Sequence, residues 1–68
     1  MENFVLLQTY FTGIEAQGAK NTLASYNIFS EIIGEMGATM YNVFTPAQGG
    51  IRLFVHEKDA EKAAKVLG

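Results

Sequence analysis

The sequence has 68 residues, of which 49% are hydrophobic, and five Lys or Arg against seven Asp or Glu give it a formal net charge of -2. This length accommodates one domain with a single hydrophobic core and no second lobe. The negative charge disfavours nucleic acid as a partner, because binding to phosphates requires an excess of basic side chains. No apolar run approaches the roughly 20 residues that span a bilayer, so we expect a cytoplasmic protein without a membrane segment.

Cysteine is absent, and His56 is the one histidine. The chain therefore cannot form disulfides or a thiolate metal site, and one imidazole is too few for a typical metal centre. We expect neither a metal nor a cofactor. Natural domains below about 70 to 80 residues usually gain stability from disulfides, a metal or a second subunit. Of these three, self-association is the one that this composition favours.

The chain begins with a predicted strand over residues 3–11, which are rich in β-branched and aromatic side chains and free of Gly and Pro. Its first half, from Phe4 to Leu7, is apolar at every position. Since successive side chains of a strand point to opposite faces, this pattern implies that both faces of the strand are covered.

A helix is predicted over residues 13–26. Thr12 and Glu15 have the spacing of a capping box at its start, and Asn27 tolerates the left-handed conformation that ends helices. Gly18 lies within the helix, where glycine costs about 0.5 to 1 kcal/mol relative to alanine. We expect that another element approaches Gly18 closely and so accounts for its presence.

The second half of the sequence predicts two further strands and a final helix. Residues 28–33 predict the second strand, residues 51–55 the third, and residues 57–67 a helix with a narrow alanine-rich stripe. Residues 34–50 contain a turn cluster before the third strand, and the part before it fits a strand or a helical turn about equally.

This order predicts an α+β domain, a half ferredoxin-like βαββα sandwich with a three-stranded mixed sheet and two helices on one face. Alternation in the third strand sends three apolar side chains toward the helices: Ile51, Leu53 and Val55. Arg52, Phe54 and His56 then lie on the opposite face, which has no cover among the predicted helices. The first strand is expected to have an exposed edge.

Two explanations account for the uncovered face and the apolar first strand. Either residues 34–50 fold back over the face, or a second copy of the chain packs against it and buries apolar area. In the second case, the predicted interface consists of Phe4, Val5, Leu6, Leu7 and Phe54.

The same face holds a cluster that could bind an anion or an aromatic group. The predicted ligand-binding residues are Tyr41, Asn42, Arg52, Phe54 and His56. The alternative is that Arg52 and His56 only keep this face soluble. Nothing in the sequence spaces a nucleophile, a base and an orienting group as a known catalytic constellation, so we predict no catalytic residues and no enzyme activity.

Residues 49–63, with the sequence GGIRLFVHEKDAEKA, resemble the ending of a family of short bacterial domains described as signal-transducing proteins. The first strand and the helix that ends at Tyr26-Asn27-Ile28 also resemble this family. The resemblance implies a PII-like βαββα fold, similar to part of the nitrogen-regulatory PII proteins, and a role in signalling. It implies no catalytic or binding residues.

The sequence thus favours a non-catalytic regulatory or protein-interaction module that self-associates as a homo-oligomer or binds another protein. The second hypothesis is a sensor of a small metabolite or anion on the open sheet face, by analogy with the PII proteins.

Overall fold

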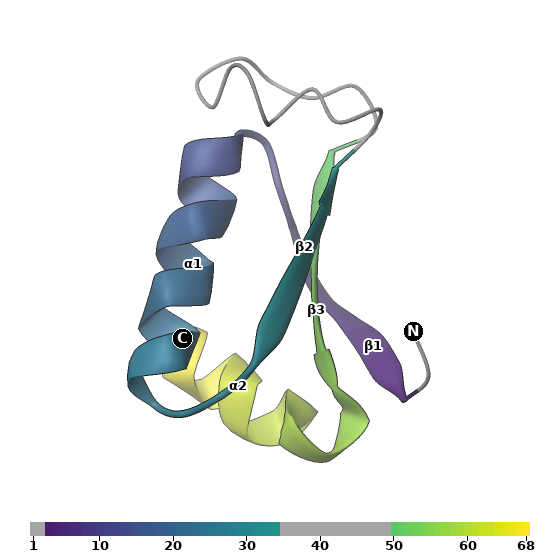
Figure 1. Cartoon of the computed structure of the whole chain (residues 1–68), viewed down its shortest axis with the longest axis vertical. Helices are drawn as coiled ribbons and strands as arrows, with labels where there is room; N and C mark the ends of the chain where they lie inside the picture. The colour runs from purple at the N-terminus through teal and green to yellow at the C-terminus, as the bar shows by residue number, and fades with distance from the viewer. Residues whose placement is uncertain (1–2, 35–49) are drawn as a thin grey trace.

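A computed structural model describes residues 3–34 and 50–68. They form a small α+β domain of three strands and two helices (Figure 1). In chain order the elements are β1 (Phe4–Tyr10), α1 (Gly13–Ser25), β2 (Ser30–Gly34), β3 (Ile51–His56), the 3-10 turn η2 (Glu57–Asp59) and α2 (Ala60–Leu67). Most of the segment whose conformation the sequence left open, residues 35–49, lies outside the described residues.

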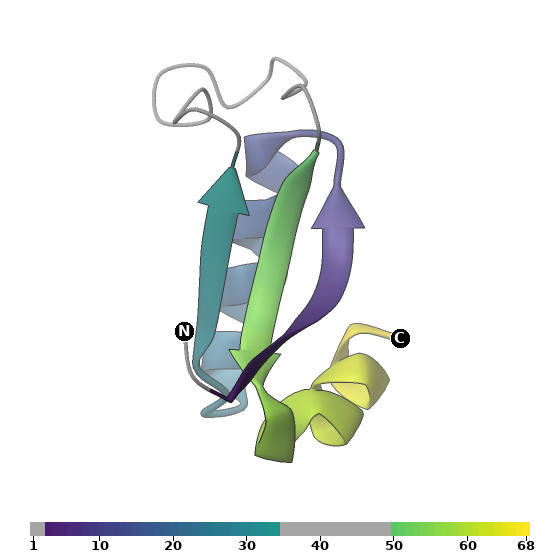
Figure 2. The same cartoon turned by 90° about the vertical axis from the view of Figure 1, so that its right-hand side faces the viewer.

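The sheet has the strand order β1-β3-β2, and β3 is antiparallel to both of its neighbours. β1 and β2 run in the same direction, but they are separated by β3 and do not pair (Figure 2). The expected mixed sheet is therefore wrong, because every paired ladder is antiparallel. α1 connects β1 to β2, which lie two positions apart in the sheet, and β3 pairs with both of them from the position in between.

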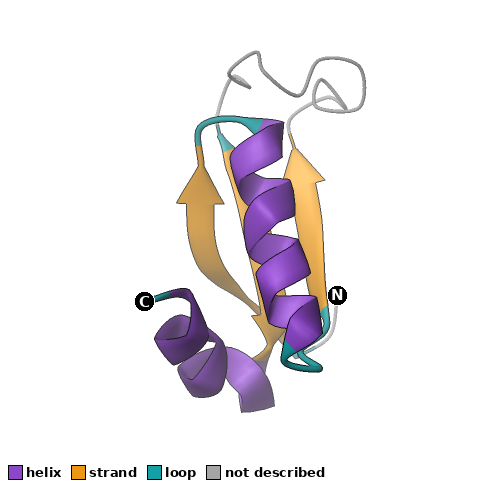
Figure 3. Cartoon of the chain, turned by 90° about the vertical axis from the view of Figure 1, so that its left-hand side faces the viewer, coloured by secondary structure: helices purple, strands orange, loops and turns teal. Residues whose placement is uncertain are grey.

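Both helices lie on the same side of the sheet, as predicted. α1 runs along the length of the sheet, and α2 lies near the end where β3 finishes (Figure 3). On the other side, no element of residues 3–34 and 50–68 covers the strands (Figure 2). The two faces of the sheet consequently differ in burial.

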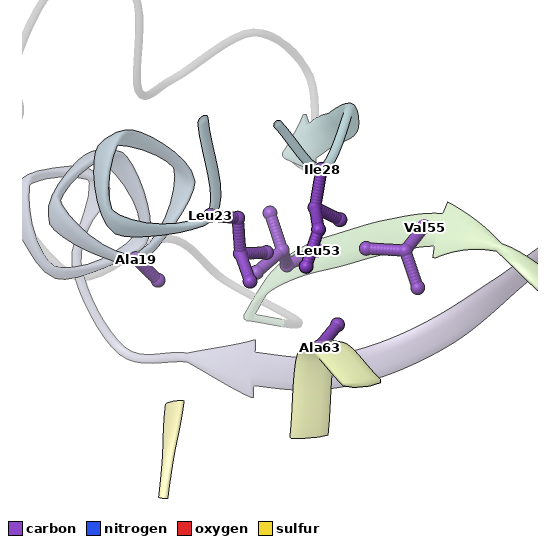
Figure 4. Close-up of a cluster of buried hydrophobic side chains, with 6 residues drawn as sticks. All are labelled: Ala19, Leu23, Ile28, Leu53, Val55 and Ala63. Atoms are coloured by element: carbon purple, nitrogen blue, oxygen red, sulfur yellow. The ribbon is translucent and has the colours of Figure 1, made fainter. Parts of the chain in front are cut away.

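The main core lies between the sheet and the helices (Figure 4). Its buried side chains come from α1, the turn after it, β3 and α2: Ala19, Leu23, Ile28, Leu53, Val55 and Ala63. A smaller cluster joins Ala16 of α1 to Ile51 of β3. The predicted alternation in β3 is confirmed, since its odd-numbered residues are buried and its even-numbered residues are partly exposed.

A β-bulge in β1 explains how its side chains are shared between two faces. Leu6 pairs with Phe54 and Gln8 pairs with Leu53, so Leu7 is the extra residue between them. Without the bulge, Tyr10 would share a face with Leu6. With it, Tyr10 turns to the core and packs against both clusters, where burial raises the pKa of its phenol and the Glu15 carboxylate raises it further.

Local signals fix both ends of α1 as predicted. At its start, the Thr12 hydroxyl accepts a hydrogen bond from the Glu15 N–H, and the Glu15 carboxylate accepts one from the Thr12 N–H. At its end, Asn27 has a φ of 63°. The Asn27 and Ile28 N–H groups donate to the carbonyls of Ala24 and Leu23, which is the Schellman arrangement.

The expectation of a close approach at Gly18 is wrong, because a Cβ added there would meet nothing within 4 Å. Gly50 differs from it: its φ is +83°, and an added Cβ would lie 2.7 Å from the Thr9 Cγ2. The free space beside one glycine and the crowding beside the other should give alanine opposite effects at the two positions.

We expect Gly18→Ala to raise the free energy of unfolding by about 0.5 to 1 kcal/mol through helix propensity. Gly50→Ala should lower it by about 1 to 2 kcal/mol, because a left-handed conformation is costly for a residue with a Cβ. Adding Thr9→Ser to Gly50→Ala removes the crowding methyl group and should restore part of the loss. Urea denaturation of the four proteins measures these differences, and equal effects of the two alanines would contradict this account.

Ser30 is the one polar residue buried in the described part of the chain, with 2% of its surface exposed. Its Oγ has no hydrogen-bond partner among these residues. A buried polar group without a partner costs about 1 to 3 kcal/mol.

We therefore expect Ser30→Ala to leave the free energy of unfolding unchanged or raise it by about 1 kcal/mol, as measured by thermal and urea denaturation. A loss of stability would mean that the hydroxyl is hydrogen-bonded in solution.

Candidate functional site

The candidate site is the face of the sheet that the helices do not cover, called here the open face. Its members follow from the strand registers, because residues that pair across strands point to the same side. The open face consists of Phe4, Leu6 and Thr9 from β1, Arg52, Phe54 and His56 from β3, Glu31 and Ile33 from β2, and Phe29 just before β2.

Phe54 lies at the centre of the open face. It pairs with Leu6 of β1 on one side and with Glu31 of β2 on the other. Arg52 and His56 precede and follow it by two residues on β3, so both point to the same side. An aromatic ring at the centre is thus bordered by one aliphatic, one acidic and two nitrogen-bearing side chains.

Three rings gather at one corner of the open face. The Phe4 and His56 ring centroids are 4.2 Å apart, and the Phe29 ring lies 6.1 Å from Phe4 in an edge-to-face arrangement. The Phe29 and His56 centroids are 6.2 Å apart. These separations are typical of favourable aromatic pairs, so this corner forms a defined surface of packed rings.

The open face leaves large apolar side chains in contact with solvent. Leu6 is 50% exposed and Phe29 is 56% exposed. Phe4, Ile33 and Phe54 are partly buried beside them. Single exposed apolar residues are common on proteins, but a contiguous group on one sheet face is typical of a surface that binds a partner.

A pocket lies at the end of β3, next to the aromatic corner. It is lined by Asn3, His56, Glu57 and Lys58. The Glu57 N–H donates a hydrogen bond of 2.7 Å to the Asn3 carbonyl, and Asn3 has a φ of 66°. This contact ties the residue before β1 to the residue after β3, and both of these residues line the pocket.

The structure brings together part of the predicted site. Arg52, Phe54 and His56 share the open face with the predicted interface residues Phe4 and Leu6. Tyr41 and Asn42 of the predicted ligand cluster lie outside the described residues.

Val5 and Leu7 were predicted for the interface, but they point to the helix side and pack against the core. They pack there because β1 alternates, and its inward side chains complete the core that β3 and the helices form. Phe29, Glu31 and Ile33 belong to the open face although the sequence did not indicate them. The pairing of β2 with β3 places them there. Because side chains alternate along a strand, a sequence prediction that put Ile32 in the core would also have put its neighbours Glu31 and Ile33 on the open face.

Two further features, a metal-binding cluster and a membrane-spanning helix, were sought among the described residues. No group of three or more His, Cys, Asp or Glu side chains in residues 3–34 and 50–68 is arranged to hold a metal ion. Within the same ranges, no helix has the length and apolarity needed to cross a membrane.

Comparison of the chain with protein-family models, curated proteins and solved structures finds no match. The open face itself must therefore carry any functional proposal.

Proposed function

We propose that this chain is a non-catalytic interaction module, with a regulatory role of the signal-transducing kind, whose open face binds a second copy of the same chain. The observation that carries the proposal is the contiguous apolar surface of the open face, in which Leu6 and Phe29 are half-exposed and Phe54 lies partly buried between β1 and β2. Its chemistry is suited to contact with a protein surface, because apolar side chains gain free energy when they leave water.

A second copy is the favoured partner because the core of one copy is thin. The eight buried hydrophobic residues of the described part include three alanines, which each bury little apolar area. A chain of this size rarely obtains more than about 3 to 5 kcal/mol from one core. Burial of the open face in a dimer would add apolar contacts that the two helices cannot supply, since both lie on the other side of the sheet.

We further infer that the domain corresponds to a half ferredoxin-like, PII-like sandwich. Support comes from the split arrangement in which β3 lies between β1 and β2, two strands that run the same way and are joined by a helix. In this interpretation β1 is an edge strand, and the bulge at Leu7 interrupts its regular edge. Bulges of this kind discourage edge-to-edge pairing, which favours the sheet face as the contact surface.

The test is a pair of matched lysine substitutions. Leu6 on the open face is 50% exposed, and Ile14 on α1 is 48% exposed, so their lysine variants place equal charge at equal exposure on different surfaces. We expect the wild type and Ile14→Lys to form dimers at micromolar concentrations and Leu6→Lys to be monomeric. Sedimentation velocity over a wide dilution range measures this difference.

Thermal denaturation at a concentration where all three proteins are monomeric checks that each remains folded. A wild-type protein that stays monomeric up to millimolar concentration would contradict the proposal. Equal dimerisation by Leu6→Lys would show that the contact surface lies elsewhere.

Binding of a small anionic ligand is the second candidate function, and the pocket at the end of β3 is the observation that favours it. Lys58 and His56 line this pocket and can interact with an anion, while Glu57 opposes a ligand of high negative charge. Arg52, which the sequence grouped with His56, is not among its lining residues. The pocket therefore favours a small, singly charged or aromatic acid over a polyphosphate.

A thermal-shift screen with small carboxylic and aromatic acids tests this candidate. We expect a saturable rise in melting temperature of a few degrees that Lys58→Ala removes. Lys65→Ala, which changes another exposed lysine, on α2 and outside the pocket lining, should keep the shift. No shift from any acid in the panel would count against a sensor role.

A further inference from the structure

β2 is the second edge strand of the sheet, and it lacks the bulge that interrupts β1. It pairs with β3 in an unbroken register over all five of its residues. No strand of residues 3–34 and 50–68 pairs with its other side, and α1 lies over the strands without crossing that side (Figure 3). A regular edge strand of this kind presents its outward backbone groups to an added strand.

The registers show which backbone groups of β2 point away from β3. The Glu57 N–H donates a hydrogen bond to the Asn3 carbonyl, so the backbone at residue 57 points toward β1. Backbone direction alternates along an antiparallel ladder, so Phe54, three residues earlier, points its N–H and C=O toward β2, where it pairs with Glu31. Glu31 and Ile33 therefore direct their backbone groups to β3. The outward groups of β2 belong to the alternate residues, which are Ser30, Ile32 and Gly34.

We propose that β2 pairs with β2 of a second copy, antiparallel and centred on Ile32, so that two three-stranded sheets join into one. This contact lies beyond the open face and does not depend on it. The outward residues are symmetric about Ile32, because Ser30 of one copy then lies opposite Gly34 of the other and Ile32 lies opposite itself. In this register the outward N–H and C=O groups of all three residues face a partner, as a two-fold contact between identical strands requires.

The side chains of β2 suit this register. Glu31 of one copy lies opposite Ile33 of the other, so no like charges are paired across the contact. β2 carries one charged residue and no proline, and it therefore lacks most of the features by which natural edge strands prevent pairing.

The two-fold axis of this contact stands perpendicular to the sheet. The helices of both copies consequently remain on one side, and the two open faces join into a single surface of twice the width. Edge pairing thus enlarges the surface that the proposed function uses.

The contact itself is small, because each copy contributes one strand of five residues. Interfaces below about 1,200 Å² of total buried area are typical of weak and transient complexes. We therefore expect the Leu6→Lys variant, whose open face carries an added charge, to be monomeric at micromolar concentration and to pair through β2 near millimolar concentration.

Nuclear magnetic resonance of Leu6→Lys tests this pairing apart from the open face. In a millimolar mixture of isotope-labelled and unlabelled chains, we expect an inter-chain Overhauser effect between the Hα atoms of Glu31 and Ile33, which lie close in this register. The Ile32 amide should exchange with solvent quickly in dilute protein and several-fold more slowly at millimolar concentration. The Ile33 amide, which points to β3, should exchange slowly at both concentrations.

Two substitutions at residue 33, made in the Leu6→Lys background, form a matched pair. Ile33→Glu places two carboxylates opposite each other, whereas Ile33→Lys places an ammonium group opposite Glu31. Both remove the same apolar side chain, so its loss affects the two variants alike. The dissociation constant of the Glu variant should exceed that of the Lys variant roughly tenfold or more, as measured by sedimentation equilibrium. Thermal denaturation checks that both remain folded.

Three results would each overturn the edge pairing. They are an Ile32 amide that is already protected in dilute protein, equal dissociation constants of the two residue-33 variants, and no inter-chain effect at millimolar concentration. The proposed function survives all three, because its test is the difference between Leu6→Lys and Ile14→Lys at micromolar concentration. Equal self-association of Leu6→Lys and the wild type, with the inter-chain effect present, would support the edge pairing and overturn the open-face contact.

Discussion

The rest of the structure depends on the central position of β3. Both edges of this strand are paired, so its backbone groups are satisfied by β1 on one side and by β2 on the other. Its side chains then have only two directions available. Ile51, Leu53 and Val55 form the floor of the core, and the alternate residues are necessarily displayed on the other side, where no helix of the described chain lies.

This one-sided cover links the stability of the domain to its proposed function. The two helices bury one face of the sheet and contribute mostly small side chains to it, so the core remains thin. The larger apolar groups of the open face, with Phe54 at their centre, are held outward by the same alternation that builds the core. A surface that costs free energy in water and is fixed in shape by a sheet is suited to bind another protein.

Much of the local structure could be predicted from the sequence because its causes are local. The capping box at Thr12 and Glu15 and the left-handed Asn27 involve neighbours a few residues away, and the alternation in β3 is visible in its own sequence. Other features depend on distant residues. The Leu7 bulge depends on the register with β3, more than 40 residues later, and it explains how Leu7 and Tyr10 both face the core.

The candidate site also combines features that depend on local sequence with features that depend on distant residues. The sequence by itself determined the element order, the helix ends and the outward direction of Arg52, Phe54 and His56, because periodicity and capping act within one element. Only the tertiary structure decided that β3 lies between β1 and β2 and that Glu31 stands beside Phe54. Strand order and register arise from contacts between segments far apart in the chain, and these contacts are selected by packing of the whole core and not by any local pattern.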